Sequence, residues 1–305
     1  MLAFHPLTVA DREAVQAVTL HAGRRNCNYT FANLVGWQFW FHTEVCVILP
    51  SPSGAPPTLG GKQDGTVVLR FKFDGERAYM VCTAGELSSS LVQALLEDSG
   101  GNLTLLGLED SQVAALSNSQ FSITVESRRN QYDYLYRRSD LAALQGGLLK
   151  AKRNHAGRFR AEHPDFEYRQ LTPELFDECR RLTAEWAEKK EASVTIDAEH
   201  RVMETVFSHW EALGMIGGSI FVDNRMVAFS YGAAVTTDTF DVCVEKADRS
   251  VEGAFAIVNQ QFAEHLPEQY LYLNREEDMG IPGLRKAKLS YHPEILLTYN
   301  VVVVK

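Results

Sequence analysis

Charges of both signs are concentrated in one short segment, residues 274–294, which reads NREEDMGIPGLRKAKLSYHPE. It contains the acids Glu276, Glu277 and Asp278 and, after a turn with two glycines and a proline, the bases Arg285, Lys286 and Lys288. Such a group can hold a charged substrate, or it can form a salt-bridge network that fixes the chain. We expect the turn to bring Asp278 back toward Arg285 and Lys288, which share a helix face because they are three residues apart.

A second candidate site is residues 241–259, DVCVEKADRSVEGAFAIVN. We expect a strand to end at Glu245 and a helix to begin near Gly253, with Arg249 in the turn between them. The unpaired N–H groups of a helix start suit a phosphate or carboxylate. Glu245 can accept a proton from an amine nucleophile. An ordinary strand–helix crossover and a surface Glu–Lys pair are equally compatible with these residues.

The charge of the chain is unevenly distributed. The net charge is −9, yet residues 128–160 contain nine Lys and Arg against two acids, or +7. The remaining 21 bases and 37 acids give −16. This asymmetry indicates a localised anion site, with Lys152 and Arg153 as candidate ligands of a phosphate-rich partner. An exposed basic helix without a ligand is the alternative.

Apolar periodicity predicts mixed helices and strands along the whole chain. We expect a strand over 37–49, a Pro- and Gly-rich loop over 50–65, one long helix over 139–163 that Gly146 and Gly147 can break, and a final strand over 294–304. From residue 167 the expected order is strand, two helices, three strands, helix, strand, helix and strand. Asp223-Asn224 is a hairpin signal between the first two of the three strands.

This order resembles that of an acyltransferase domain of the GNAT type, and the first half can be read as a degraded copy of it. The fold class is therefore predicted as α/β (α+β), with two tandem GNAT-like domains over 1–140 and 141–305. Each domain would be a mixed sheet flanked by helices, and the second would carry the candidate site.

The end of the charged segment carries a more specific resemblance. GLRKAKLSYHP is similar to the C-terminal signature of phosphatidylglycerol lysyltransferases in Gly283, Leu284, Lys288, Tyr291 and Pro293. It departs at Ser290, where a second lysine is usual. The chain is therefore identified as resembling a soluble relative of that C-terminal domain, with further similarity to the Fem-type peptidoglycan-bridge aminoacyltransferases.

The resemblance implies an aminoacyl or acyl transferase that takes its donor from aminoacyl-tRNA and passes it to an amine or hydroxyl acceptor. Glu245, Asp278 and Lys288 would be catalytic, with Lys288 stabilising an oxyanion. Asp278 or Glu276 would hold the amino group of the donor, or orient Arg285. The wider substrate-binding set would be Arg285, Glu276, Asn274, Arg275, Tyr291, Lys152, Arg153, Arg249 and Gly253.

Two rival functions remain. One is a coenzyme A-dependent N-acetyltransferase, but the phosphate loop of GNAT enzymes matches poorly here. Arg249 is one residue too far from Gly253-Ala254, and the first glycine of that loop is missing. Coenzyme A is therefore the less expected donor, and no cofactor is required. The other rival is a non-catalytic binding module for a charged ligand.

Composition adds general limits. With 305 residues, 45% of them hydrophobic, the chain can build a sizeable core. Five widely spaced cysteines without a CxxC pair suggest neither disulfides nor a metal site. We see no signal peptide and no apolar run long enough to span a membrane, so a cytoplasmic protein is expected and a lipid acceptor is doubtful. Possible partners are tRNA and a small-molecule or peptide amine acceptor.

Overall fold

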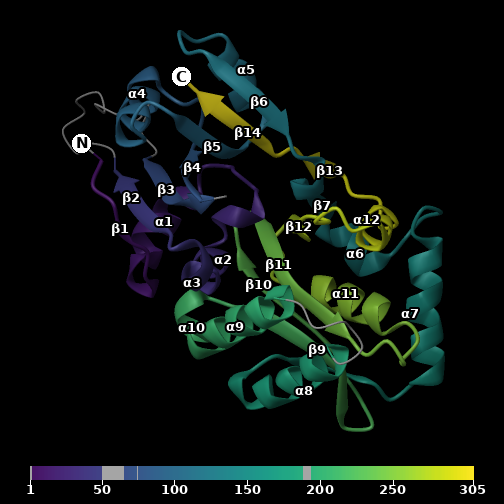
Figure 1. Ribbon diagram of the computed structural model, residues 1–305. Coiled ribbons are helices and arrows are strands. Elements are labelled where there is room, and N and C mark those ends of the chain that lie inside the picture. Colours follow the sequence, from purple (N-terminus) through teal and green to yellow (C-terminus); the bar gives the residue numbers. More distant parts are fainter. Residues whose placement is uncertain (1, 50–64, 74, 188–193) are drawn as a thin grey trace.

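Two seven-stranded mixed sheets, each packed against helices, form the molecule (Figure 1). The structure is a computed structural model that describes residues 2–49, 65–73, 75–187 and 194–305. Most of the segment predicted as a Pro- and Gly-rich loop, residues 50–64, lies outside the described residues. The predicted fold class is confirmed.

The first sheet has the strand order β1-β2-β3-β4-β5-β14-β6. Its strands are β1 (His5–Pro6), β2 (Glu44–Ile48), β3 (Thr66–Phe73), β4 (Glu76–Thr83), β5 (Leu103–Leu108), β6 (Ile123–Ser127) and β14 (Asn300–Val304). Its helices are α1 (Arg12–Thr19), α2 (Phe31–Gly36), α3 (Gln38–Phe41), α4 (Ser89–Asp98) and α5 (Asp110–Ser117). Side chains alternate along β3: Val67 and Leu69 pack in the core with α1 and α2, and Val68 packs with α4 and α5. Both faces are therefore buried.

The second sheet has the order β13-β7-β12-β11-β10-β9-β8. Its strands are β7 (Asp133–Arg137), β8 (Glu167–Gln170), β9 (Ile216–Val222), β10 (Arg225–Ala234), β11 (Thr239–Ala247), β12 (Tyr272–Asn274) and β13 (Ile295–Leu297). Its helices are α6 (Arg138–Ala143), α7 (Lys150–Glu162), α8 (Phe176–Ala187), α9 (Val194–Ser208), α10 (Trp210–Leu213), α11 (Ala254–His265) and α12 (Pro282–Leu289). One face packs with α6, α7 and α11, and the other shares a core with the first sheet.

The predicted element order of the second half is confirmed, including the hairpin between β9 and β10. Asp223 and Asn224 both have positive φ, at 49° and 61°, as a type I′ turn requires. The long predicted helix is divided into α6 and α7. Leu144 and Gly146 both have positive φ there, so the helix cannot continue through them.

Two strand predictions were wrong in detail. Residues 38–41 form the short helix α3, and only residues 44–48 of the predicted strand belong to a sheet. His42, at φ 48°, ends α3 in the left-handed conformation and redirects the chain into β2. The final predicted strand is also divided: β13 joins the second sheet and β14 joins the first.

The two sheets exchange strands across the chain. β7 precedes residue 140 but pairs with β12 and β13 in the second sheet. β14 lies near the end of the chain but pairs with β5 and β6 in the first. A domain boundary at 140/141 stays a prediction. The strands on each side of it do not separate into the two sheets.

Candidate functional site

A β-bulge in β11 decides which side chains face each side of the second sheet. Tyr231 pairs with Val244 and Ala233 with Asp241, so one β10 residue, Gly232, lies opposite two β11 residues. A Cβ at Gly232 would lie 1.8 Å from the carbonyl oxygen of Asp241, so only glycine fits there. Consequently Asp241 reaches residues of the first half, whereas Glu245 reaches α11.

Asp278 is held by four partners in the turn before α12. Arg285 binds both carboxylate oxygens, at 2.8 and 2.9 Å, and Arg129 and Tyr134 donate to Oδ2 at 3.1 and 2.6 Å. The backbone N–H of Gly280 donates to Oδ1. The side chain is fully buried, and these donors hold its pKa well below the usual range against the opposing effect of burial. The predicted approach of Asp278 to Arg285 is present, in the form of a structural lock.

Lys288 lies on α12, as Arg285 does, but it does not contact Asp278. Its buried ammonium group donates to the backbone carbonyls of Arg275 and Glu277, the latter at 2.5 Å. Burial lowers the pKa of Lys288, and the nearby carboxylate of Glu276 partly offsets that effect. Two of its three N–H groups are therefore engaged in holding the backbone of the acidic segment. This leaves it less suited to the predicted oxyanion role.

Glu245 and Arg275 form an ion pair on the α11 face of the sheet. Arg275 donates to Oε1 of Glu245 at 2.9 Å, and Asn259 of α11 donates to Oε2 at 3.0 Å. The guanidinium of Arg275 lies 4.7 Å from the ring centre of Tyr291. Tyr291 is buried, and burial raises its pKa to about 12. Glu245 is thus a paired carboxylate within reach of the helix that follows it.

A pocket of about 340 Å³ lies at the start of α11. We call it the α11 pocket; its lining includes Lys152, His155, Arg249, Gly253, Ala254 and Tyr291. The ammonium of Lys152 lies 4.2 Å from the ring centre of Tyr291. Burial, followed by the charge of Arg275, lowers the pKa of Lys152. Four of the predicted binding residues therefore line one pocket, namely Lys152, Arg249, Gly253 and Tyr291.

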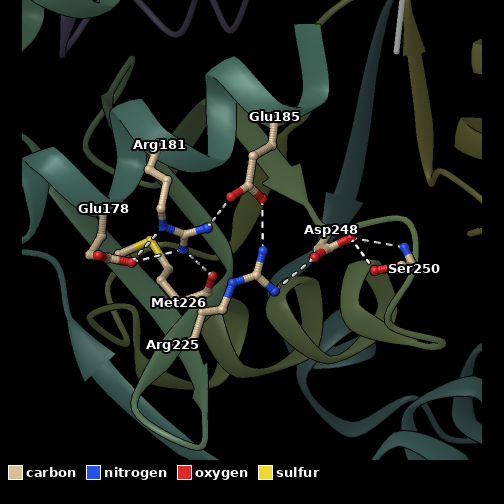
Figure 2. Close-up of polar contacts among 7 residues, drawn as sticks. All are labelled: Glu178, Arg181, Glu185, Arg225, Met226, Asp248 and Ser250. Carbon is tan, nitrogen blue, oxygen red and sulfur yellow. Dashed lines mark hydrogen bonds and ion pairs between the residues drawn. The ribbon is translucent and has the colours of Figure 1, made fainter. Parts of the chain in front are cut away.

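Figure 2 shows the ionic network that fixes the turn leading into this pocket. Asp248 accepts hydrogen bonds from the N–H and hydroxyl of Ser250 and is paired with Arg225. Arg225 also binds Glu185 of α8. Glu185 in turn binds Arg181, which donates to Glu178 and to the carbonyl of Met226 (Figure 2). The turn between β11 and α11 is thereby tied to α8 and to the start of β10.

The structure also places several predicted binding residues in structural contacts, including Gly253 of the pocket lining. Gly253 has φ 80°, and a Cβ there would lie 2.6 Å from the carbonyl oxygen of His155, so it permits the close approach of α7. Arg153 donates to the carbonyls of Leu144 and Gly146 and thus ends α6. Asn274 is fully buried, donating to Arg25 and Asp133 and accepting from Glu276.

On the opposite face of the sheet lies a group that the sequence did not reveal, which we call the acidic cluster. It consists of the carboxyl groups of Asp133, Asp241, Glu276 and Glu277 and the thiols of Cys27 and Cys243. Glu276, predicted to bind an amino group, belongs to this cluster. Its contributors come from both halves of the chain, so no local motif could have identified them.

The acidic cluster contains two groups of three that could hold a metal ion. In one, the Sγ atom of Cys27 lies 3.3 Å from Asp133 and 3.6 Å from Glu277. The other consists of Asp241, Cys243 and Glu276. In each group, one ligand atom from every residue lies within 4.8 Å of the others.

Three carboxyl groups of the acidic cluster, those of Asp133, Asp241 and Glu276, have raised pKa values. Burial and the charge of Glu277 raise the pKa of Asp133 to about 6. Burial, reinforced by Asp133 and Glu277, raises that of Asp241 well above its ordinary value. Burial and the charge of Asp241 do the same for Glu276. A bound cation would remove this penalty.

Comparisons with known proteins agree with this architecture. A conserved protein of unknown function from Bacteroides thetaiotaomicron is 37% identical, with TM-score 0.89 and 100% of both chains covered. A tandem GNAT protein from the clavulanic acid biosynthesis pathway has 12% identity and TM-score 0.51, covering 100% of this chain and 98% of its own. FemX has 9% identity and TM-score 0.59, covering 99% and 97%. No curated protein matches the chain.

The model of one protein family, described as phosphatidylglycerol lysyltransferase, C-terminal, matches residues 22–302. No helix in the described part of the chain combines the length and apolar character needed to cross a bilayer. The resemblance seen in residues 283–293 is thus confirmed over nearly the whole length. The chain has the GNAT-like fold of the tandem GNAT protein and of FemX, and it belongs to the phosphatidylglycerol lysyltransferase C-terminal family.

Proposed function

We propose that this protein transfers an aminoacyl group from aminoacyl-tRNA to an amine or hydroxyl acceptor. The observation that supports this most is the α11 pocket, which combines a helix start with Lys152 and Arg249. Helix N–H groups and cations together bind phosphate groups. Near the acceptor end of a tRNA the phosphates lie close to the ester that carries the amino acid, so this pocket would position the donor.

The surroundings of the α11 pocket suit acyl transfer. Tyr291 borders the pocket and also contacts Arg275, which pairs with Glu245. Two side chains, those of Tyr291 and Arg275, would therefore connect a phosphate in the pocket to the carboxylate of Glu245 on β11. Glu245 is our candidate for accepting the proton of the attacking amine or hydroxyl. The acceptor would be a small molecule or a peptide amine.

Coenzyme A is the rival donor, and local structure supports it less. The turn between β11 and α11 is fixed by Asp248, which binds Ser250 and Arg225. Gly253 is used for packing against α7. The glycine-rich turn with which GNAT enzymes surround a pyrophosphate is therefore absent from residues 248–254.

The direct test is transfer of a labelled amino acid from a pool of charged tRNAs to a panel of amines and hydroxyl compounds. We expect product with charged tRNA and none with aminoacyl- or acetyl-coenzyme A. Product only with a coenzyme A thioester would support the rival function. No transfer and no binding of either donor would support a non-catalytic binding protein.

Lys152→Ala tests the pocket itself. We expect the Kd for tRNA to rise at least about tenfold, because a charge-assisted phosphate contact contributes roughly 1.5–3 kcal/mol. The slope of log K against log salt should fall by about one unit. Lys150→Ala is the matched control, since Lys150 is exposed on the same helix and does not line the pocket. Equal effects of the two changes would remove the pocket from the binding site.

A further inference from the structure

The acidic cluster leaves one buried oxygen without a partner. Asp241 is fully buried, and its Oδ1 atom has no hydrogen-bond partner. Buried carboxylate oxygens are normally satisfied, because an unpaired one has lost its water without compensation. A positively charged group beside Oδ1 would supply the missing interaction.

The neighbours of Asp241 are ligands of a particular kind. Its carboxylate, the thiol of Cys243 and the carboxylate of Glu276 each present one atom within 4.8 Å of the others. The Sγ atom of Cys243 lies 3.7 Å from Oδ2 of Asp241. Around a tetrahedral zinc ion with bonds of about 2.0–2.3 Å, ligand atoms are roughly 3.5 Å apart. Small side-chain rotations would therefore close these three groups around one ion.

Residues of the first half orient the two carboxylates. Thr30 donates to Oδ2 of Asp241 at 2.7 Å, and Asn33 donates to the same atom at 3.1 Å. Asn33 also donates to Oε1 of Glu276 at 3.0 Å. Such outer hydrogen bonds fix the direction of metal-binding carboxylates. Neither residue donates to Oδ1 of Asp241, which has no hydrogen-bond partner.

We propose that Asp241, Cys243 and Glu276 bind one divalent transition-metal ion of the zinc class. The thiol decides between possible cations: an ammonium group gains little from sulfur, and magnesium or calcium prefers oxygen alone, whereas thiolate with carboxylate suits zinc. Binding would release the thiol proton of Cys243, since the thiolate is the ligand. Three protein ligands leave one tetrahedral position for water.

The neighbouring group of Cys27, Asp133 and Glu277 is the less suitable position. Both oxygens of Asp133 already accept hydrogen bonds, from the backbone and thiol of Cys27 and from Asn274. This group therefore leaves no carboxylate oxygen of Asp133 unpaired. It provides a matched control in the same cluster.

The test begins with the unaltered full chain, stripped with a chelator, incubated with zinc chloride and desalted. We expect about one zinc per chain by mass spectrometry of the metal and a higher melting temperature than that of the stripped protein. Cobalt(II) in place of zinc should give the near-ultraviolet charge-transfer band of a thiolate–cobalt bond. Absence of stoichiometric zinc, or stabilisation by ethylammonium but not by zinc, would overturn the proposal.

Variants locate the ion. Cys243→Ser should abolish the charge-transfer band, and Asp241→Asn should weaken zinc binding at least tenfold. Cys27→Ser should keep both the band and the affinity. A band that survives Cys243→Ser, or that disappears in Cys27→Ser, would contradict the assignment. The zinc and cobalt results on the unaltered chain decide whether a thiolate-bound ion is present, even if a variant does not fold.

Discussion

Asp278 illustrates how a buried carboxylate can be wholly committed to structure. It joins the turn before α12 to Arg129 and Tyr134, which come from the region before and within β7. The two guanidinium groups, of Arg129 and Arg285, are each about one third exposed. Removing the carboxylate would leave these donors and the backbone N–H of Gly280 unpaired.

We therefore expect Asp278→Ala to lower the free energy of unfolding by about 3–5 kcal/mol, the usual cost of breaking a buried ion pair. Urea denaturation measures it. Glu294→Ala, which breaks the exposed pair with Arg137, is the control and should change the free energy of unfolding much less, because solvent screens an exposed pair. A loss below 1 kcal/mol for Asp278→Ala, accompanied by loss of transfer activity, would instead restore the catalytic interpretation.

The depressed pKa of Asp278 also has a pH signature. Because the folded state binds its proton more weakly than the unfolded state, its stabilisation is present above about pH 4, the unfolded value, and is lost as pH falls through the folded pKa. Unfolding free energies measured from pH 5 downward should fall steeply for the unaltered protein. They should fall less for Asp278→Ala, and parallel curves would contradict this expectation.

The contribution of Asp133 to stability should depend on pH in the opposite direction. Its folded pKa of about 6 lies above the unfolded value of about 4, so the folded state binds more protons between these pH values. Stability should therefore fall as pH rises through this window, by up to about 3 kcal/mol from this group. In chelator-treated protein, Asp133→Asn should lack that fall. An unchanged difference between variant and parent from pH 4 to 7 would show that Asp133 titrates normally.

At this scale the sequence revealed contacts that are local and missed those that are not. Asp278 and Arg285 are seven residues apart and joined by a recognisable turn, so their approach could be predicted. Cys27 contacts Asp133 across 106 residues and Glu277 across 250. Neither spacing nor composition predicts such long-range contacts, because these contacts depend on how the two sheets pack.

Glycines set the spacing between elements around the α11 pocket. Gly253 combines a positive φ with contact to the backbone of α7. We expect Gly253→Ala to cost at least about 2 kcal/mol, from the left-handed conformation and the displacement of α7. Gly157→Ala, on α7 with open space around it, should be neutral or stabilise by up to about 1 kcal/mol. Thermal unfolding of both variants makes the comparison, and equal effects would contradict it.

Element predictions succeeded where periodicity and turn chemistry agreed, as in β9, β10 and the Asp223-Asn224 turn. They failed where an apolar run is compatible with both a strand and a helix, or with one strand and two. The aromatic run 37–41 looks like a strand, yet it forms α3 and packs Phe41 against Phe71 of β3. The division between β13 and β14 could not be predicted, because the sequence of residues 294–304 does not indicate that its two parts pair in different sheets.

At the scale of the molecule, the exchange of β7 and β14 joins both halves into one unit. We expect a single unfolding transition, in which amides of β5 in the first sheet and β11 in the second lose protection at the same urea concentration. Hydrogen exchange followed by mass spectrometry can resolve the two strands. Two separate midpoints would show that the halves unfold independently despite the shared strands and the shared core.

The position of β14 has a consequence for biosynthesis. Asn300 binds the carbonyl of Leu108 across 192 residues, and β14 fills the place between β5 and β6. Until β14 has been translated, β5 and β6 lack the strand that lies between them, and one backbone edge of each stays unpaired. Exposed edges of this kind recruit other strands. A chaperone that covers nascent β-strands, or slow translation before residue 300, would therefore change the yield of folded protein more than the stability of the finished chain suggests.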